Sequence, residues 1–318
     1  MSIADRVRRW LVDQVARAYL WVHRRAPFLG ITVYRVLLRI LGASLLERVL
    51  DLPPLAVPRP APGDVCLHVL TKHNEALFAL WACRSLLERL DRSLPVFIHD
   101  DGSLTSHDIA RIQASLPGAL VVTRTEADRL ARERLAHLPR CLELRAANVL
   151  SLKLFDPWVV QATGDVILID SDVLFFRRPV EVQRWLDDPQ GRFNRWNVET
   201  RIGKPADQEA ASRTLNSGFG LITRASIAFD AIEAWLDGNQ RLGGWLIEQE
   251  IYDWLSGGAE AAGLPLDYHV ANAIDPRPPS SVSTHYVGSV RGFFLSEGIP
   301  RLVTLIPAPP ENLRSSPP

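Results

Sequence analysis

The 318-residue sequence predicts an α/β protein in which a mostly parallel sheet is flanked by helices and preceded by a helical appendage. From residue 64 onward, short apolar runs that read as buried strands alternate with helical patterns, which is the order of consecutive βαβ units. Residues 1–50 carry only the helical pattern. With 47% hydrophobic and 23% charged residues, the composition is that of one large globular domain with an appendage.

The first 50 residues form the predicted appendage. Apolar side chains recur at steps of three and four on both sides of Pro27 and Gly30, which predicts two amphipathic helices separated there. Nine Arg and three acidic residues give this segment a net charge of 9 − 3 = +6. Two interpretations stay open: the helices pack on the main domain, or they lie on an anionic membrane surface with Trp10, Trp21 and Phe28 at the interface.

A proline-rich linker over residues 51–63 leads into the α/β domain, which we place at residues 64–306. We expect strands at 65–70, 95–99, 119–122 and 166–169, and helices at 76–90, 106–115, 126–136 and 144–161. Past Pro179 the pattern loosens, and we expect a short strand around 221–223 and helices around 227–237 and 245–255. The Pro- and Ser-rich residues 307–318 are predicted to be disordered.

Charge, cysteine usage and hydropathy exclude several classes of protein. The formal net charge is zero, which gives no reason to expect a nucleic-acid partner. The three cysteines are widely spaced and odd in number, which fits neither a disulfide framework nor a zinc site and favours a reducing compartment. No apolar run reaches the roughly 18 residues of a membrane span, and no cleavable signal is evident. We therefore expect a cytoplasmic protein that is peripheral, if membrane-bound, at the inner face.

The strand at 166–169 is followed by two carboxylates, Asp170 and Asp172. Carboxylates at the end of a buried strand need neutralisation, and Mg²⁺ or Mn²⁺ with substrate phosphates supplies it. The carboxyl edge of a parallel sheet is also where α/β proteins bind ligands. This arrangement predicts a metal–diphosphate site. The alternative is that both aspartates only shape a turn.

Three further segments follow the two aspartates. They are Asn216-Ser217-Gly218, Glu248-Gln249, and the run from His285 through Gly288 to Arg291. Their order and spacing resemble the retaining glycosyltransferases of family eight, which have the Rossmann-like GT-A fold. That family has an Asp-x-Asp after a strand, an Asn-Ala-Gly turn, an Asp-Gln pair opening a helix, and a late His-x-x-Gly-x-x-Lys. The resemblance covers roughly residues 64–295.

The resemblance implies a metal-dependent glycosyltransferase that moves a sugar from a nucleotide-diphosphate donor, expected to be a UDP-sugar, to an acceptor hydroxyl. It implies that Mn²⁺ or Mg²⁺ is held by Asp170, Asp172 and His285. It places Asn216, Glu248 and Gln249 around the reacting sugar. The residues expected to bind the nucleotide donor are Thr71, Asn74, Asp101, Lys153, Gly288 and Arg291.

Two positions depart from the family pattern. Arg291 replaces the usual Lys, and Ser151 stands where the family's helix has Arg. These departures motivate an alternative, in which a degenerate GT-A domain serves as a non-catalytic sugar- or nucleotide-binding module or membrane scaffold. A phosphatase of the haloacid-dehalogenase type is disfavoured, because its aspartates follow the first strand of the fold. If transfer is inverting, Glu248, Glu250 or Asp207 is the candidate base.

The acceptor is expected to meet residues 190–214, which contain several cations and Trp196. An indole can stack on a sugar face, and cations can bind a phosphate or carboxylate of the acceptor. Together with the basic appendage, this segment suggests a glycan or lipid-linked acceptor. A solvated loop is the equally open alternative.

Overall fold

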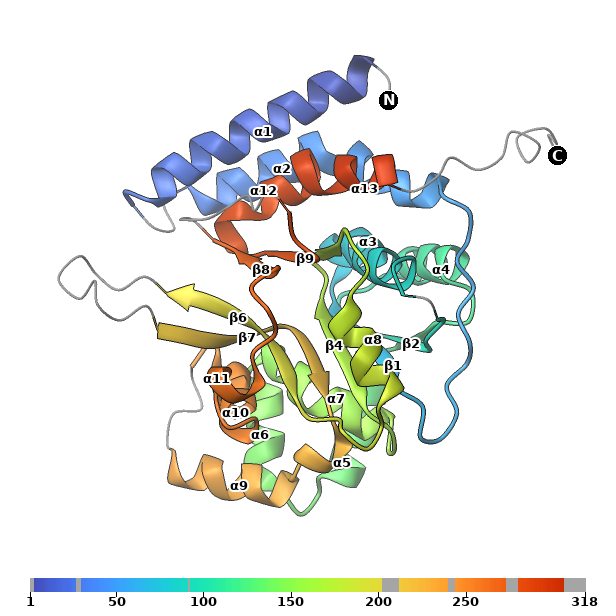
Figure 1. Cartoon of the computed structure of the whole chain (residues 1–318), viewed down its shortest axis with the longest axis vertical. Helices are drawn as coiled ribbons and strands as arrows, with labels where there is room; N and C mark the ends of the chain where they lie inside the picture. Colours follow the sequence, from blue (N-terminus) through green and yellow to red (C-terminus); the bar gives the residue numbers. More distant parts are fainter. Residues whose placement is uncertain are drawn as a thin grey trace.

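A computed structural model of the chain shows a six-stranded sheet between two helical layers, with a helical hairpin lying across one end of the molecule (Figure 1). The structure describes residues 3–26, 30–90, 92–201, 212–239, 244–272 and 280–305. The strand order is β3-β2-β1-β4-β7-β6. The strands are β1 (Cys66–Thr71), β2 (Val96–Asp100), β3 (Leu120–Val122), β4 (Val166–Asp170), β6 (Arg195–Arg201) and β7 (Ser212–Ile222).

The first four strands are parallel and the last two are antiparallel additions. β1 pairs in parallel with β2 and β4, and β2 pairs in parallel with β3. β7 runs antiparallel to β4, and β6 antiparallel to β7. The carboxyl ends of β1, β2 and β4 therefore meet at one edge, where Thr71, Asp100 and Asp170 end their strands. The predicted mostly parallel α/β fold is confirmed.

A second, three-stranded sheet completes this edge. It has the order β5-β9-β8, with β5 (Val173–Phe175), β8 (Tyr268–Ala271) and β9 (Ser283–Tyr286). β5 starts one residue after Asp172, and its antiparallel register sets Val173 opposite His285. The backbone N–H of Tyr286 also donates to the Asp172 carbonyl at 2.9 Å. This small sheet brings a late segment of the chain to the aspartates that end β4.

The alternation of β4 divides the core into two layers. Ile167 and Ile169 belong to one apolar cluster, and Val166 and Leu168 to the other, because successive strand residues point to opposite faces. The first layer contains α3 (Ala76–Leu87) and α4 (Ser106–Ser115). The second contains α5 (Arg124–Arg134), α6 (Pro139–Ala147) and α7 (Leu152–Val160).

Two elements differ from the sequence-based prediction. The single helix expected at 144–161 is two helices, because Asn148 is extended and its side chain accepts from the Leu150 N–H, which ends α6 and starts a new turn. The short strand expected at 221–223 is the end of the long β7, whose residues 219–222 pair with β4 and whose mostly polar residues 212–216 pair with β6. Local propensity missed both features, since tertiary pairing overrides it.

The remaining helices follow the sheet strands. They are α8 (Val180–Asp187), α9 (Phe229–Gly238), α10 (Ile247–Leu255), α11 (Ala259–Ala262), α12 (Arg291–Phe293) and α13 (Ile299–Leu305). The segment at 307–318, predicted to be disordered, lies outside the described residues.

The appendage forms a hairpin of α1 (Ile3–His23) and α2 (Ile31–Glu47), in blue at one end of Figure 1. Val12 and Ala16 of α1 and Leu38 of α2 share the apolar cluster of Phe293 and Phe294. The hairpin therefore packs on the main domain, which is one of the two interpretations that the sequence left open. None of the helices in the described part of the chain has the length and apolar character needed to cross a bilayer.

The proline-rich segment runs against the domain. Backbone N–H groups of Leu55 and Val57 donate to the carbonyls of Ser115 and Pro117. A Cβ on Gly118 would lie 2.0 Å from the Val57 carbonyl oxygen, so the chain crosses α4's end in close contact.

Two buried histidines tie β1 to β2. His68 Nε2 lies 2.8 Å from Gln161 Oε1, and His68 Nδ1 lies 2.8 Å from His99 Nε2. Gln161 donates its amide N–H to the Asp64 carbonyl, so its Oε1 accepts from His68. Burial lowers the pKa of His68 to about 4 and the pKa of His99 well below its usual value. Both imidazoles are thus neutral in the folded protein near neutral pH.

These histidines predict acid sensitivity. The unfolded chain takes up a proton at His68 near the ordinary value of 6.5, whereas the folded chain does so only near 4, so stability falls as the pH drops between these values. From about pH 7 to about pH 5 we expect a loss of about 2 kcal/mol in the free energy of unfolding from His68. Urea unfolding at both pH values measures it. His68→Gln should reduce this slope, and replacing the exposed His107 should not; equal slopes in both variants would contradict the assignment.

Candidate metal centre and active site

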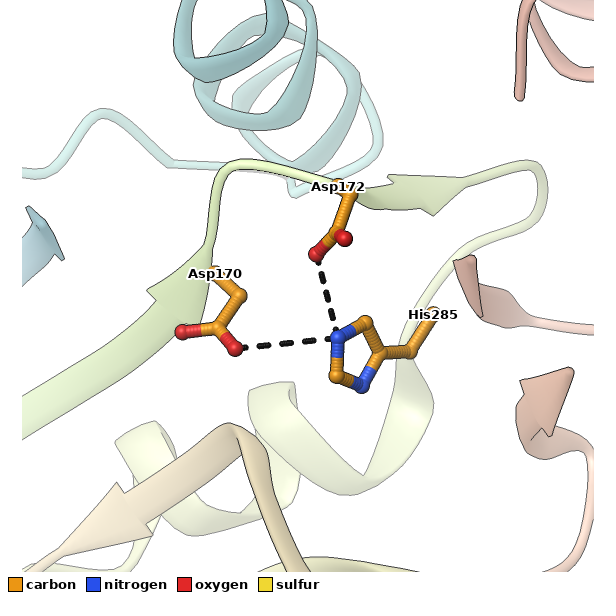
Figure 2. Close-up of side chains that lie close together, drawn as sticks. All are labelled: Asp170, Asp172 and His285. Atoms are coloured by element: carbon orange, nitrogen blue, oxygen red, sulfur yellow. Dashed lines mark ion pairs between the residues drawn. The ribbon is translucent and has the colours of Figure 1, made fainter. Parts of the chain in front are cut away.

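Three potential metal ligands converge at the edge where the two sheets meet (Figure 2). Asp170 is the last residue of β4, Asp172 precedes β5, and His285 lies on β9. His285 Nε2 is 3.0 Å from Asp172 Oδ1 and 3.6 Å from Asp170 Oδ2. One ligand atom from each residue lies within 4.8 Å of the others. The three residues that the sequence suggested are therefore brought together.

The ring of His285 is oriented by Asn216. Asn216 Oδ1 accepts from the Gly218 N–H at 3.0 Å and lies 2.9 Å from His285 Nδ1. Since that oxygen is an acceptor, Nδ1 carries the proton and donates to it, which leaves the lone pair of a neutral imidazole on Nε2. Such a hydrogen bond on the far nitrogen is the usual way that proteins fix a metal-binding histidine.

Gly218 makes room for the same ring. A Cβ built on Gly218 would lie 2.1 Å from His285 Cε1 and 2.2 Å from Nδ1. No side chain fits there unless the imidazole moves. The Asn-Ser-Gly motif thus supports His285 in two ways, through the Asn216 acceptor and through the missing Cβ of Gly218.

This donor set fits a divalent cation. Two carboxylates and one imidazole nitrogen are hard and borderline ligands, which suit Mg²⁺, Mn²⁺ and similar ions. His285 Nε2 and one carboxylate oxygen each of Asp170 and Asp172 converge on one space, where a cation in place of an Nε2 proton would contact all three. The residues present therefore fit the metal that the sequence suggested.

Asp170 and Glu248 share one buried lysine. Lys153 Nζ is 3.0 Å from Asp170 Oδ1 and 3.3 Å from Glu248 Oε1. Ser217 Oγ donates to the same Glu248 oxygen at 2.7 Å. Burial alone would lower the pKa of Lys153, but the charges of Asp170 and Glu248 outweigh it and raise the pKa above its usual value. Lys153 is therefore a fixed positive charge beside the metal ligands.

Asp172 and Glu75 share a second cation. Arg291 donates from Nε to Asp172 Oδ2 at 3.0 Å, a further N–H reaches the same oxygen, and another N–H reaches Glu75. Burial alone would raise the pKa of Asp172, but the charge of Arg291 outweighs it and holds the pKa of that carboxyl well below its usual value. Asp172 is thus ionised, as a metal ligand must be.

The inner charges leave a deficit of positive charge. Four carboxylates (Asp170, Asp172, Glu75 and Glu248) are neutralised by two largely buried cations, Lys153 and Arg291, which gives −4 + 2 = −2. Lys72 also contacts Glu75 at 3.1 Å, but it is half-exposed and its charge is screened by solvent. One divalent cation would balance the cluster.

Gln249 joins the site through Ser217. Its Oε1 accepts from the Ser217 N–H at 3.1 Å, which leaves its Nε2 group as a donor. Glu248 Oε2 is buried and has no hydrogen-bond partner in the described part of the protein. The Glu-Gln pair that the sequence singled out therefore opens α10 against the same cluster.

The predicted nucleotide-binding residues lie around this edge at different depths. Thr71 is buried at the end of β1, and its Oγ1 has no partner among the described residues. Asn74 is exposed in the following turn. Asp101 accepts from Ser103 N–H at 3.0 Å and shapes the loop after β2. Gly288 has a φ of +49°, and a Cβ there would meet nothing within 4 Å, so open space adjoins this backbone.

Sequence reasoning missed three members of the hydrogen-bond network around the candidate metal ligands, namely Ser217, Ser171 and Glu75. Ser217 links Lys153, Glu248 and Gln249, and Ser171 donates to Glu75 at 3.0 Å. Ser217 lies inside the Asn216-Ser217-Gly218 motif, and Glu75 ends the polar run after β1. Their positions next to predicted site residues could have identified them. Ser151, which stands where the family pattern has Arg, is buried and donates to the backbone carbonyls of Leu144 and Asn148.

Trp196 does not have the expected sugar-stacking role. It is fully buried, its Nε1 donates to Ser256 Oγ at 2.9 Å, and its ring packs on Tyr252. The bulge at Trp196 in β6 turns the indole inward. Glu250 is exposed on α10, and Asp207 lies outside the described residues.

Comparison with known structures supports the same fold. The galactosyltransferase LgtC, in complex with donor and acceptor sugar analogues, superposes with a TM-score of 0.50 over 79% of this chain and 99% of its own, at 13% identity. Mouse xyloside xylosyltransferase 1 in its apo form gives 0.50 over 70% of this chain and 98% of its own, also at 13% identity. The chain has the GT-A fold. The likeness that the sequence suggested is confirmed at the level of fold.

An active-site mutant of LgtC gives the same TM-score of 0.50 at 16% identity. No model of a known protein family matches the sequence, and no curated protein matches it either. At these identities the similarity is one of fold, and the chemistry has to be argued from the site.

Loss of the Asn216 acceptor should weaken metal binding. In Asn216→Ala, His285 Nδ1 has no fixed acceptor, so the ring loses its orientation and the affinity for Mn²⁺ should fall about ten- to a hundredfold. Asn216→Asp keeps an acceptor oxygen and should bind Mn²⁺ more tightly than the Ala variant. Isothermal titration with Mn²⁺ measures both, and an unchanged affinity in Asn216→Ala would contradict the positioning role.

Gly218→Ala should displace the His285 ring. The overlap with a 2.1 Å contact should cost about 1–3 kcal/mol of stability and lower Mn²⁺ affinity. Gly238→Ala is the matched control, because a Cβ there meets nothing within 4 Å. Urea unfolding and Mn²⁺ titration of both variants test this; equal behaviour would show that the ring does not depend on Gly218.

Proposed function

We propose that this protein is a metal-dependent glycosyltransferase that moves a sugar from a nucleotide-diphosphate donor to an acceptor hydroxyl. The observation that carries the proposal is the group of Asp170, Asp172 and His285, with the imidazole tautomer set by Asn216. It lies at the carboxyl edge of a GT-A sheet, where α/β folds bind ligands. LgtC, whose structure contains donor and acceptor sugar analogues, shares this fold.

Mn²⁺ or Mg²⁺ is the proposed cofactor, and a UDP-sugar the proposed donor. When bound, the cation would neutralise the diphosphate and stabilise it as a leaving group. Asp170, Asp172 and His285 would hold it, with Arg291 keeping Asp172 in place and ionised. Gly288 begins the turn after β9, and its open backbone would approach a phosphate oxygen.

The donor sugar is proposed to lie against Lys153, Glu248 and Gln249. Glu248 Oε2 is free to accept a sugar hydroxyl, while Glu248 Oε1 is held by Ser217 and Lys153. Gln249 offers its Nε2 group toward the reacting carbon. Because these groups are buried and already hydrogen-bonded, they would orient the sugar at little further entropic cost.

Thr71, Asn74 and Asp101 are the proposed contacts for the base and ribose, since they follow β1 and β2 at the same edge. The acceptor is proposed to be a glycan or a lipid-linked saccharide, and the protein to act in the cytoplasm. No nucleic-acid partner is proposed, since the chain has no net charge.

Thermal unfolding with nucleotides tests the proposal. UDP, GDP, ADP and CMP are each added with Mn²⁺ and with EDTA. A ligand at a hundredfold its Kd stabilises the native state by about 2.7 kcal/mol, so a bound nucleotide raises the midpoint. We expect a shift with UDP that requires Mn²⁺. Hydrolysis or transfer of UDP-sugars then identifies turnover.

Asp172→Asn should abolish the Mn²⁺-dependent shift and the turnover, because it removes an anionic ligand. Asp237→Asn, on the exposed side of α9, is the matched control and should behave as wild type. Turnover in Asp172→Asn near that of the control would contradict the metal role. Absence of any nucleotide shift in the wild type would favour the non-catalytic membrane scaffold instead.

A further inference from the structure

The outer side of the α1–α2 hairpin exposes large apolar side chains along both helices. On α1, Ile3, Val7 and Trp10 are spaced by four and three residues, and on α2 Val33, Val36 and Ile40 follow the same spacing. Ile3 is 72% exposed, Trp10 60%, Val33 63% and Ile40 69%. The opposite faces, with Val12 and Leu38, are buried on the domain. Each helix therefore has a second apolar stripe that is exposed in the described part of the structure.

Arginines surround these stripes. Seven are exposed on the described part of the hairpin, namely Arg6, Arg8, Arg17, Arg24, Arg25, Arg35 and Arg39. Over residues 3–26 and 30–47, Glu47 is the one exposed acid. An apolar stripe with Trp, flanked by long cationic side chains, is the composition of helices that lie flat at an anionic membrane interface.

A cavity opens beside the same face. It has a volume of about 350 Å³ and is lined on α1 by Arg6, Arg9, Trp10, Asp13 and Arg17, with Ser296 and Glu297 opposite. Arg9 is anchored there by donating from Nε to the Ser296 carbonyl at 2.7 Å. Arg17 is paired with Asp13 at 2.6 Å, so Arg6 and Arg9 are the cations of this cavity that suit a lipid phosphate whose chains lie along the apolar stripe.

The charge argues against a second copy of the chain as the occupant. A symmetric dimer through this face would set two arginine-rich surfaces against each other. A surface that carries negative charge and an apolar interior satisfies both the arginines and the stripes. An anionic bilayer has both properties.

The hairpin is also joined to the segment that carries Gly288 and Arg291. Tyr34 Oη donates to the Ser289 carbonyl at 3.0 Å and accepts from the Gly292 N–H at 2.9 Å. A Cβ on Gly292 would lie 2.6 Å from Ala16 Cβ, so α1 touches this backbone directly. Any surface to which the hairpin binds is thus coupled, through the hairpin, to the turn beside the candidate metal ligands.

We propose that the outer face of the α1–α2 hairpin is a docking surface for an anionic lipid bilayer. The stripes enter the headgroup region while the arginines bind lipid phosphates. The hairpin lies flat on the bilayer because its inner face stays packed on α12 and on the helical turn that begins at Phe294. Docking holds the candidate active site beside the membrane, where a lipid-linked acceptor would be presented; this last consequence rests on the proposed function.

Vesicle flotation of the full chain tests the docking surface. The probes are phosphatidylcholine vesicles with and without phosphatidylglycerol, at low and high salt, with no nucleotide. We expect the protein to float with the anionic vesicles, less so at high salt, and to stay behind with neutral ones. Deletion of the hairpin is avoided, because it would expose the core around Phe293 and Phe294.

Two variants separate the apolar and the charged contributions. Ile40→Glu should lower binding to anionic vesicles at least about tenfold, because a carboxylate replaces an inserted side chain. Leu266→Glu is its control, since Leu266 is 54% exposed and belongs to the segment before β8, not to the hairpin. Arg35→Glu with Arg39→Glu should also abolish most binding, whereas the same change at Arg132 and Arg134 on α5 should have little effect.

Equal flotation of Ile40→Glu and Leu266→Glu, or no flotation of the wild type, would overturn the proposal. Sedimentation equilibrium tests the alternative in which a second copy of the chain occupies this face. If Ile40→Glu turns a dimer into a monomer and leaves flotation unchanged, the face is a contact between copies. Asp172→Asn should float like wild type. Wild-type protein that floats with anionic vesicles but binds no nucleotide would count against the proposed enzyme and not against the docking surface.

Discussion

The placement of the buried, ionised Asp172 beside Asp170 at the end of β4 is the constraint on which the rest of this site depends. Asp172 is 3% exposed, and Asp170 lies beside it at the mouth of the sheet. Charges so placed are costly unless they are paired. Lys153 and Arg291 each neutralise one of them but are themselves shared with Glu248 and Glu75. The remaining negative charge is what suits this edge to a cation.

His285 connects this electrostatic cluster to the fold. Its ring reaches the aspartates because β5 and β9 pair in one register, and it is aimed by Asn216 from β7. Gly218 is small for the same reason. A shift of β9 by one residue would turn His285 to the opposite face of the small sheet. The geometry of the metal ligands is therefore determined by strand pairing as much as by the ligands themselves.

The hairpin and the candidate active site also form one mechanical unit. Tyr34 stacks on Tyr19, with ring centroids 4.0 Å apart, and bonds to the backbone on both sides of Arg291. The turn after β9 is thus held between the small sheet and the hairpin. The apolar pattern of the first 50 residues is present on two faces. This packing explains one of them, which contacts the domain, and the other is exposed.

Much of this protein could be predicted from sequence because its strongest signals are local. The buried run before Asp170, the alternation of strands and helices and the order of the short motifs determined the α/β fold and the three ligand residues. Other features depended on contacts between distant segments. The break at Asn148, the inward turn of Trp196, the Lys153 link between Asp170 and Glu248, and the role of Gly218 arise from neighbours far away in the chain. Periodicity reports which face of an element is apolar, but only tertiary packing decides which buried polar group meets which, since each partner lies on a different strand or helix.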